Sequence, residues 1–191
     1  MDFLSFIDAR GWFGLLHLLG IALGAGGAYM SDLMFLFSAK DRVFSASEIK
    51  FMKLGSRMVW AGLALLIVSG IALVIIRPEI FLKSEKFWAK ITIVGIILIN
   101  GIIFHLVHLP RMTRQADKDF TLSEEFMKYS RFLMTSGAIS MVSWTLALVL
   151  GALRSVPYSY GQIMIFYLVF LTIAIIASRF LVKLFLSRKT V

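Results

Sequence analysis

Residues 88–109 read WAKITIVGIILINGIIFHLVHL, a run in which apolar side chains greatly outnumber polar ones. As an α-helix this run extends roughly 33 Å, at about 1.5 Å per residue, which is enough to cross a bilayer core of about 30 Å. The apolar residues are contiguous rather than alternating, and this pattern favours a helix over a strand of a membrane barrel. The stretch therefore predicts a membrane-spanning helix.

Four further runs of the same kind lie at 12–37, 58–76, 132–153 and 161–182. The composition agrees, because 59% of the 191 residues are hydrophobic and only 16% are charged, whereas an average soluble domain carries about 25% charged residues. We predict an all-α integral membrane bundle of five transmembrane helices, forming a single domain over residues 1–191. The chain has no cysteine, which excludes thiolate metal sites and iron–sulfur clusters.

The connections between the runs carry further signals. Segments at about 40–56 and 120–130 mix apolar and charged residues, and we expect both to be amphipathic cytoplasmic segments resting at the lipid headgroups. Ser47 and Ser123 are the expected helix caps in these segments. Pro110 directly follows the third run, where we expect that helix to end.

The basic residues predict the orientation. The formal net charge is +9, but nearly all the charges lie between the apolar runs, which argues against nucleic-acid binding. Of the 20 Lys and Arg residues, 14 fall on the side of the C-terminus. Because cytoplasmic loops are enriched in Lys and Arg, the N-terminus is predicted outside and the C-terminus in the cytoplasm of a bacterial inner membrane, as a multi-pass protein. Six lie on the other side: Arg10, Arg77, Lys83, Lys86, Lys90 and Arg154.

Ionisable groups inside membrane-spanning segments are costly, so each is a candidate site residue. Counting along the predicted helices places His17, Lys90 and Arg154 near the outer face. Asp32 and Arg57 fall near the inner face, on adjacent antiparallel helices. An ion pair between Asp32 and Arg57 is the expected arrangement, with a proton relay as the alternative.

Two further histidines, His105 and His108, also lie near the inner face. Because they are three residues apart, they share a helix face and form either a metal pair or an interfacial pair. His17 and His105 lie near opposite faces, so we do not expect the two to bridge one haem. The remaining polar residues of the spans are expected to form interhelical hydrogen bonds and packing contacts: Asn100, Ser136, Ser140, Ser143 and Trp144.

The first run contains the sharpest pattern, HLLGIALGAGGA over residues 17–28. At 100° per residue, His17 and Gly24 lie close to one line along the helix, with Gly20 beside them. A histidine on a stripe of small residues would let a flat tetrapyrrole lie against the helix. The alternative is a small-xxx-small contact with a neighbouring helix, in which the histidine only forms a hydrogen bond.

Two short stretches carry a family resemblance. Leu16-His17-Leu18-Leu19-Gly20 followed by Gly26-Gly27, together with Phe87-Trp88-Ala89-Lys90, resembles the first and third helices of two related families. These are the bacterial copper-resistance D membrane proteins and the HemJ-type protoporphyrinogen oxidases. The resemblance implies bound haem b, with His17 and Lys90 at the positions of the histidine and lysine that the HemJ type requires.

These observations lead to the hypothesis of a haem-binding membrane protein with a redox role, such as a membrane oxidoreductase, with haem b near the outer face. His17 would be the axial ligand, Gly20 and Gly24 would line the site, and Lys90 and Arg154 would pair with the propionates. No catalytic residue is predicted. The alternatives are a transporter-like subunit for a metal or an anion, and a structural or assembly subunit. The expected partners are the lipid bilayer and either a second copy of the chain or a membrane redox protein, with no nucleic acid.

Overall fold

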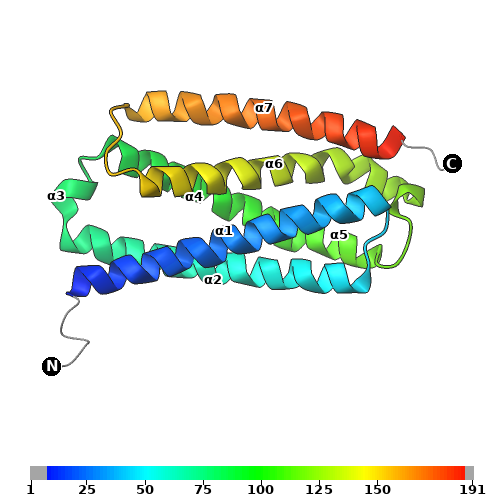
Figure 1. Cartoon of the computed structure of the whole chain (residues 1–191), viewed down its shortest axis with the longest axis horizontal. Coiled ribbons are helices and arrows are strands. Elements are labelled where there is room, and N and C mark those ends of the chain that lie inside the picture. Colours follow the sequence, from blue (N-terminus) through cyan, green and yellow to red (C-terminus); the bar gives the residue numbers. More distant parts are fainter. Residues whose placement is uncertain (1–7, 188–191) are drawn as a thin grey trace.

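The structure, a computed structural model, describes residues 8–187, apart from the side chains of 39–40, 121, 125–126 and 181–187. It confirms the predicted all-α bundle, since five helices are long and apolar enough to cross a membrane and no strand forms in the described residues. The chain is thus a multi-pass membrane protein by the length and composition of its helices (Figure 1). The elements are α1 (Ala9–Asp41), α2 (Ala46–Ile76), α3 (Pro78–Phe81), α4 (Glu85–Ile103), the π-helical η2 (Phe104–His108), α5 (Leu109–Arg114), the 3₁₀ turn η3 (Phe120–Leu122), α6 (Glu124–Ala152) and α7 (Tyr160–Ser187).

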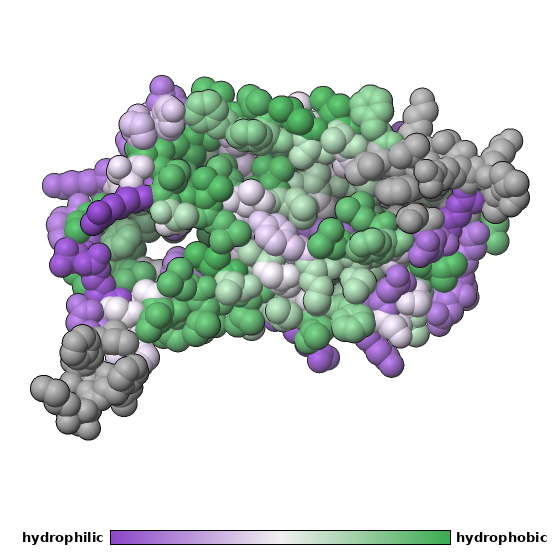
Figure 2. Space-filling model, in the orientation of Figure 1, coloured by the Kyte–Doolittle hydropathy of each residue, from purple (hydrophilic) through white to green (hydrophobic). Residues whose placement is uncertain are grey.

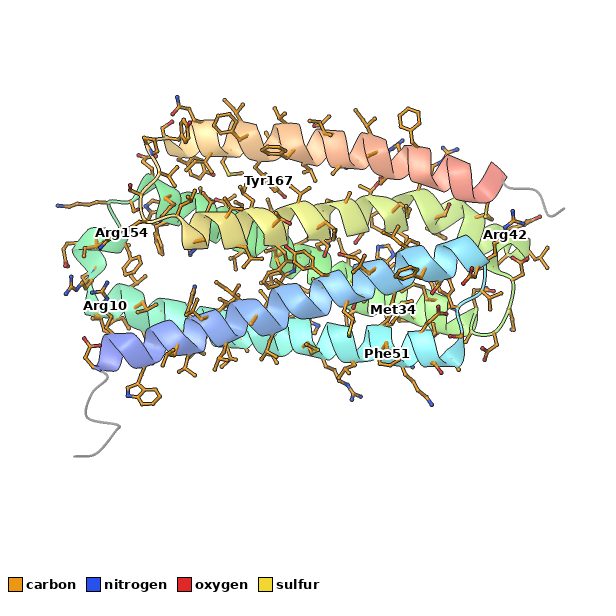
Figure 3. The ribbon with its side chains drawn as sticks, in the orientation of Figure 1. Arg10, Met34, Arg42, Phe51, Arg154 and Tyr167 are labelled. Atoms are coloured by element: carbon orange, nitrogen blue, oxygen red, sulfur yellow. The ribbon has the colours of Figure 1, made fainter. Side chains whose placement is uncertain are left out.

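The two ends of the bundle contain different helix termini. One end, which we call the Arg10 end, contains the starts of α1, α4 and α7 and the ends of α2 and α6 (Figure 1). Arg154 lies at the same end, whereas Arg42 lies at the opposite end, which we call the Arg42 end (Figure 3). By the charge count above, the Arg10 end is the predicted outer end.

Helices α1 and α2 form the closest pair in the bundle, and glycines make their approach possible. A Cβ atom on Gly27 would lie only 2.6 Å from the backbone oxygen of Gly55. A Cβ atom on Gly62 would likewise lie 2.6 Å from the backbone oxygen of Gly20. Because lipid gives helices no hydrophobic reason to associate, such backbone contact through small residues is a main source of their packing energy.

A second layer contains α4, α6 and α7, and Trp144 of α6 packs between the two layers. Its indole meets the α1 backbone at Gly24, where it fills the space that a side chain would need. The hydroxyl groups of Ser143 and Tyr167 are 2.9 Å apart and join α6 to α7. The outer face of α7 is apolar and exposed, as at Phe180, which is 69% exposed, and lipid would cover such a face. The fifth spanning helix, α7, is therefore peripheral.

The two amphipathic segments are not separate surface helices, and this corrects the prediction. Ser45 rather than Ser47 caps α2, through a capping box with Glu48, and the helix then runs without a break to Ile76. Residues 124–130 are likewise the first turns of α6. Neither segment contains a proline to separate it from the apolar run that follows, so each simply extends a spanning helix.

The connections at the Arg42 end pack on one another. Phe44 is fully buried and stacks on Phe120, with ring centroids 4.9 Å apart. Its backbone oxygen accepts from the Asp117 amide at 2.8 Å, and the Asp117 side chain accepts from the Ala46 amide at 3.0 Å. These contacts close the Arg42 end around a second apolar core.

Pro110 lies inside a continuous helical run instead of ending it, which is a second correction. A proline ring clashes with the carbonyl four residues earlier, and the helix accommodates it by widening. The Leu109 amide donates to the oxygen of Phe104, five residues back, and the π-helical turn η2 results. Both His105 and His108 lie in this turn, and π-helical turns are often found at functional sites.

The contact between α1 and α2 gives a direct test of the fold. We expect Gly62→Ala to lower the free energy of unfolding by about 1–3 kcal/mol, because the new methyl group meets backbone atoms of α1 that can only move together with the helix. Gly26→Ala is the matched control, since a Cβ atom there meets nothing within 4 Å. Thermal unfolding of the two purified variants in one detergent would measure the difference. Equal transition midpoints would contradict this packing.

Candidate functional site at the Arg10 end

The imidazole of His17 has a fixed orientation on α1. Its Nδ1 lies 2.9 Å from the hydroxyl oxygen of Ser69 on α2, and that hydroxyl donates to the Leu65 carbonyl oxygen at 2.5 Å. A serine hydroxyl has one hydrogen, and with that hydrogen on the Leu65 oxygen the Ser69 oxygen accepts from His17 Nδ1–H, which assigns the His17 proton to Nδ1. The lone pair therefore lies on Nε2, which has no hydrogen-bond partner in the described part of the chain. Metal-binding histidines are commonly oriented in this way by a partner on the second nitrogen.

The molecule is hollowed at this end, between the two layers. Figure 2 shows the opening, with hydrophilic side chains along the left edge and apolar ones along the rest. Gly151 of α6 is exposed, and a Cβ atom there would lie 3.8 Å from the Ile21 side chain and 3.9 Å from Lys90 Nζ. Gly14 is one turn before His17, and a Cβ atom there would meet nothing within 4 Å. A side chain at Gly151 would therefore be in ordinary van der Waals contact with α1 and α4, whereas Gly14 borders open space.

The Lys90 ammonium has no ion pair or hydrogen bond within residues 8–187. It projects from α4 toward Ile21, which is one helical turn beyond His17 on α1. The prediction that His17 and Lys90 occupy the same end of the bundle therefore agrees with the structure. An unpaired cation of this kind attracts an anion, because a charge held in a low-dielectric region is costly without a partner.

Arg154 lies two residues beyond the end of α6 and is exposed. Its backbone oxygen accepts from Lys86 Nζ at 3.4 Å, and the neighbouring Leu153 oxygen accepts from the same ammonium at 2.7 Å. These bonds fix the chain after α6 to the start of α4. Arg154 is therefore at the rim of the Arg10 end (Figure 3), as the sequence predicted.

Gly20 and Gly24 do not line this opening, and that prediction is corrected. A Cβ atom on Gly20 would lie 3.0 Å from the backbone oxygen of Gly62, so this position faces α2. Gly24 faces the indole of Trp144. A flat ring does lie against the glycine stripe, but it is a side chain of the protein. The small-xxx-small alternative is the arrangement observed.

The predicted ion pair between Asp32 and Arg57 is also absent. The Arg57 side chain is exposed, whereas Asp32 Oδ2 is buried and has no hydrogen-bond partner. The reason is the helix rotation that the glycine contact imposes. Ser31, rather than Asp32, faces α2 at Gly55, and Asp32 therefore points toward Gly137 and Ser140 of α6.

The Asp32 carboxyl instead faces a small, partly open cavity of about 40 Å³ between the helices. Polar side chains from four helical elements line it, and two of their oxygen atoms, Ser31 Oγ and Asp32 Oδ2, are buried without a partner. Asn100 and Ser136 form a reciprocal pair at its wall, with distances of 3.1 and 2.8 Å. The polar lining consists of Ser31, Asp32, Ser56, Trp60, Asn100, Ser136, Ser140 and Trp144.

Sequence reasoning did not assemble this cavity. Asn100, Ser136 and Ser140 were expected to form packing contacts, and Asp32 was assigned to an ion pair. The available signal was their position, because Asn100 and Ser140 fall near the middle of predicted spans and Ser136 lies one helical turn before Ser140. What was missing was the rotation of α1, which decides whether Asp32 faces α2 or α6.

His105 and His108 do not form a metal pair. His105 is exposed, and its Nδ1 lies 3.1 Å from the Ser56 hydroxyl oxygen. His108 is only 2% exposed and packs against the rings of Phe104 and Phe132. No group of three or more metal-binding side chains occurs within the described residues.

Comparison with known protein families, with curated proteins and with solved structures finds no match for this chain.

The tautomer of His17 provides a test of the site. We expect the ¹⁵N chemical shifts of labelled histidine to show a proton on Nδ1 and none on Nε2 in the wild type, because Ser69 can only accept. Ser69→Ala removes that acceptor, and the signal should shift toward a mixture of tautomers. Ser143→Ala is the matched control, because Ser143 is an equally buried serine that contacts Tyr167 instead. A proton on Nε2 in the wild type would contradict the geometry.

Proposed function

We propose that this chain is a haem-binding membrane protein of the bacterial inner membrane, with a redox role and with haem b held at the Arg10 end. One observation carries the proposal. The His17 imidazole lies against Ser69 and Gly70 of α2 and its Nε2 has no hydrogen-bond partner in the described residues, and the same end holds an unpaired ammonium at Lys90. The resemblance of the first and third helices to haem-binding families points the same way.

The chemistry of the donors fits such a group. A neutral imidazole fixed by a hydrogen bond on Nδ1 is a usual axial ligand of haem iron. The propionates are anions that require cations in a low-dielectric region, and Lys90 supplies one inside the bundle. Arg154 would supply a second at the rim. When bound, haem provides one-electron transfer.

In this function the residues of the chain would orient the axial imidazole and exclude water from the haem. Ser69 holds the imidazole in one tautomer, so its ring does not need to reorient on binding. Ile21 borders the opening and would exclude water from its inner part, while Trp144 separates it from the polar cavity on the other side. Electron exchange would occur through the exposed Arg10 end, with another membrane protein or a second copy of the chain.

A transporter-like subunit without a cofactor is the second candidate. The unpaired Lys90 ammonium favours it, because an ammonium beside an opening would also attract a small anion. The two candidates differ at His17, since only haem ligation requires the Nε2 lone pair. They are therefore separable by optical spectroscopy.

Absorption spectra of the purified protein test the proposal. Protein expressed with added haem precursor should show a Soret band, and His17→Ala should abolish it, because no other histidine reaches this end of the bundle. Lys90→Met should retain the band but release haem several-fold faster to an apo-globin acceptor. His105→Ala is the matched control and should leave the band unchanged.

Three outcomes would overturn the proposal. The first is a wild type without a Soret band after haem supplementation. The second is a band that persists in His17→Ala. The third is uptake of a small anion by the protein in vesicles in the absence of haem, with loss of uptake in Lys90→Met, which would favour the transporter-like candidate.

A further inference from the structure

A second site lies in the half of the bundle toward the Arg42 end. Asp32 is in a membrane-spanning helix, and its Oδ2 atom is buried without a hydrogen-bond partner. The ionised form of such a group would carry a large desolvation cost unless a cation neutralised it. An unneutralised carboxyl in the interior of a membrane helix is typical of proton and ion pathways.

No cationic side chain faces Asp32 from the elements packed against it. Arg57 of α2 and Arg131 of α6 are both exposed, and α4 contributes the neutral Asn100. In η2, His108 is enclosed by phenylalanines, so His105 is the titratable group nearest to the cavity wall, through Ser56. Within the described residues the cavity lining contains one ionisable side chain, which is Asp32.

The cavity can hold the water that such a group needs. Its volume of about 40 Å³ exceeds the roughly 10–15 Å³ that one water molecule requires. Ser31 Oγ and Asp32 Oδ2 both lack partners, and Ser140 is within hydrogen-bonding reach of the carboxyl. Two or more polar partners are therefore available to each water molecule.

A polar route connects the cavity to the surface. Ser56 lines the cavity and is only 4% exposed, while its hydroxyl oxygen is 3.1 Å from Nδ1 of the exposed His105. His105 lies in the π-helical turn that Pro110 produces, and its ring packs edge-on to Trp60 at the cavity wall, with centroids 6.4 Å apart. The imidazole thus joins the outside of the bundle to the cavity through one hydroxyl group.

We propose that Asp32 is a proton-binding site inside the membrane bundle and that it is loaded from the Arg42 end through His105 and Ser56. A proton from water reaches the imidazole, passes along the Ser56 hydroxyl and cavity water, and forms an O–H bond on the Asp32 carboxylate. The imidazole is neutral again once it has passed the proton on, so one proton leaves the solvent and one carboxylate charge is neutralised. The inference is independent of haem binding at the Arg10 end.

A proton fits this site better than a sodium ion. A sodium ion needs several oxygen ligands without competing bonds, and Asn100 and Ser136 already satisfy each other. Ser56 is likewise engaged with His105. The oxygen atoms left for a cation are those of Ser31, Asp32 and Ser140, whereas one carboxyl oxygen and one water molecule are sufficient for a proton.

Infrared spectroscopy of the full-length protein in lipid nanodiscs tests this inference. Near neutral pH, where exposed carboxyls are ionised, the wild type should show the C=O stretch of a protonated carboxylic acid, and alkaline buffer should remove it reversibly. Asp32→Asn should abolish the band, and Asp41→Asn, which changes an exposed aspartate at the end of the same helix, should leave it intact. Ser140→Ala should shift its frequency without abolishing it.

Two further measurements test the route and the identity of the ion. Ser56→Ala should slow the exchange of this band in D₂O several-fold, and an unchanged exchange rate would overturn the proposed route. Replacing choline chloride with sodium chloride at fixed pH should leave the band unchanged. A band that sodium abolishes, or a wild type without the band, would overturn the proton site. Each result can be obtained on protein without haem, so failure here is distinguishable from failure of the haem proposal.

Discussion

The close contact between the α1 and α2 backbones is the constraint on which the other features depend. Gly20, Gly27, Gly55 and Gly62 let the two helices approach until backbone meets backbone. This contact fixes the rotation of α1 about its axis, and rotation decides where every other side chain of that helix points. His17 consequently meets Ser69, and Asp32 turns away from α2 toward α6.

The same rotation divides the interior into two polar regions. His17 and Asp32 are 15 residues apart, or roughly 22 Å along the helix. Between them, Gly24 receives the Trp144 indole, and this ring closes the space between the layers. The half toward the Arg10 end contains the opening, the His17 imidazole and the Lys90 ammonium, and the half toward the Arg42 end contains a small cavity with a carboxyl. Neither Lys90 nor Asp32 is neutralised by a side chain within residues 8–187, so each remains available to an ion from outside the chain.

The sequence predicted the architecture well because the bilayer imposes simple rules. Continuous apolar runs of the right length identified all five helices, and counting residues placed His17 and Lys90 at the same end. These predictions depend only on the rise per residue and on the cost of exposing backbone in lipid. The predicted orientation of the termini rests on the charge count alone.

The wrong predictions concern how each helix is rotated about its axis and where each helix begins and ends, and both depend on contacts between helices. A helical projection placed Gly20 and Gly24 beside His17 but could not show that Gly62 and Trp144 cover them. The predicted ion pair between Asp32 and Arg57 was wrong for the same reason. The positions of two residues along their helices do not determine whether their side chains face each other. The capping box at Ser45 and Glu48 was readable in the sequence, whereas the π-helical turn before Pro110 was not, because a proline can either end a helix or widen it.

The central claim is that the opening at the Arg10 end is a ligand site formed by His17 and Lys90. An electron cryo-microscopy structure of the protein purified from haem-supplemented cells, bound to an antibody fragment for alignment, tests it most directly. The account predicts planar density in that opening, in contact with His17 Nε2 and with its acidic edge toward Lys90. Lipid acyl chains filling the opening, or α4 and α6 closed directly onto α1, would contradict it.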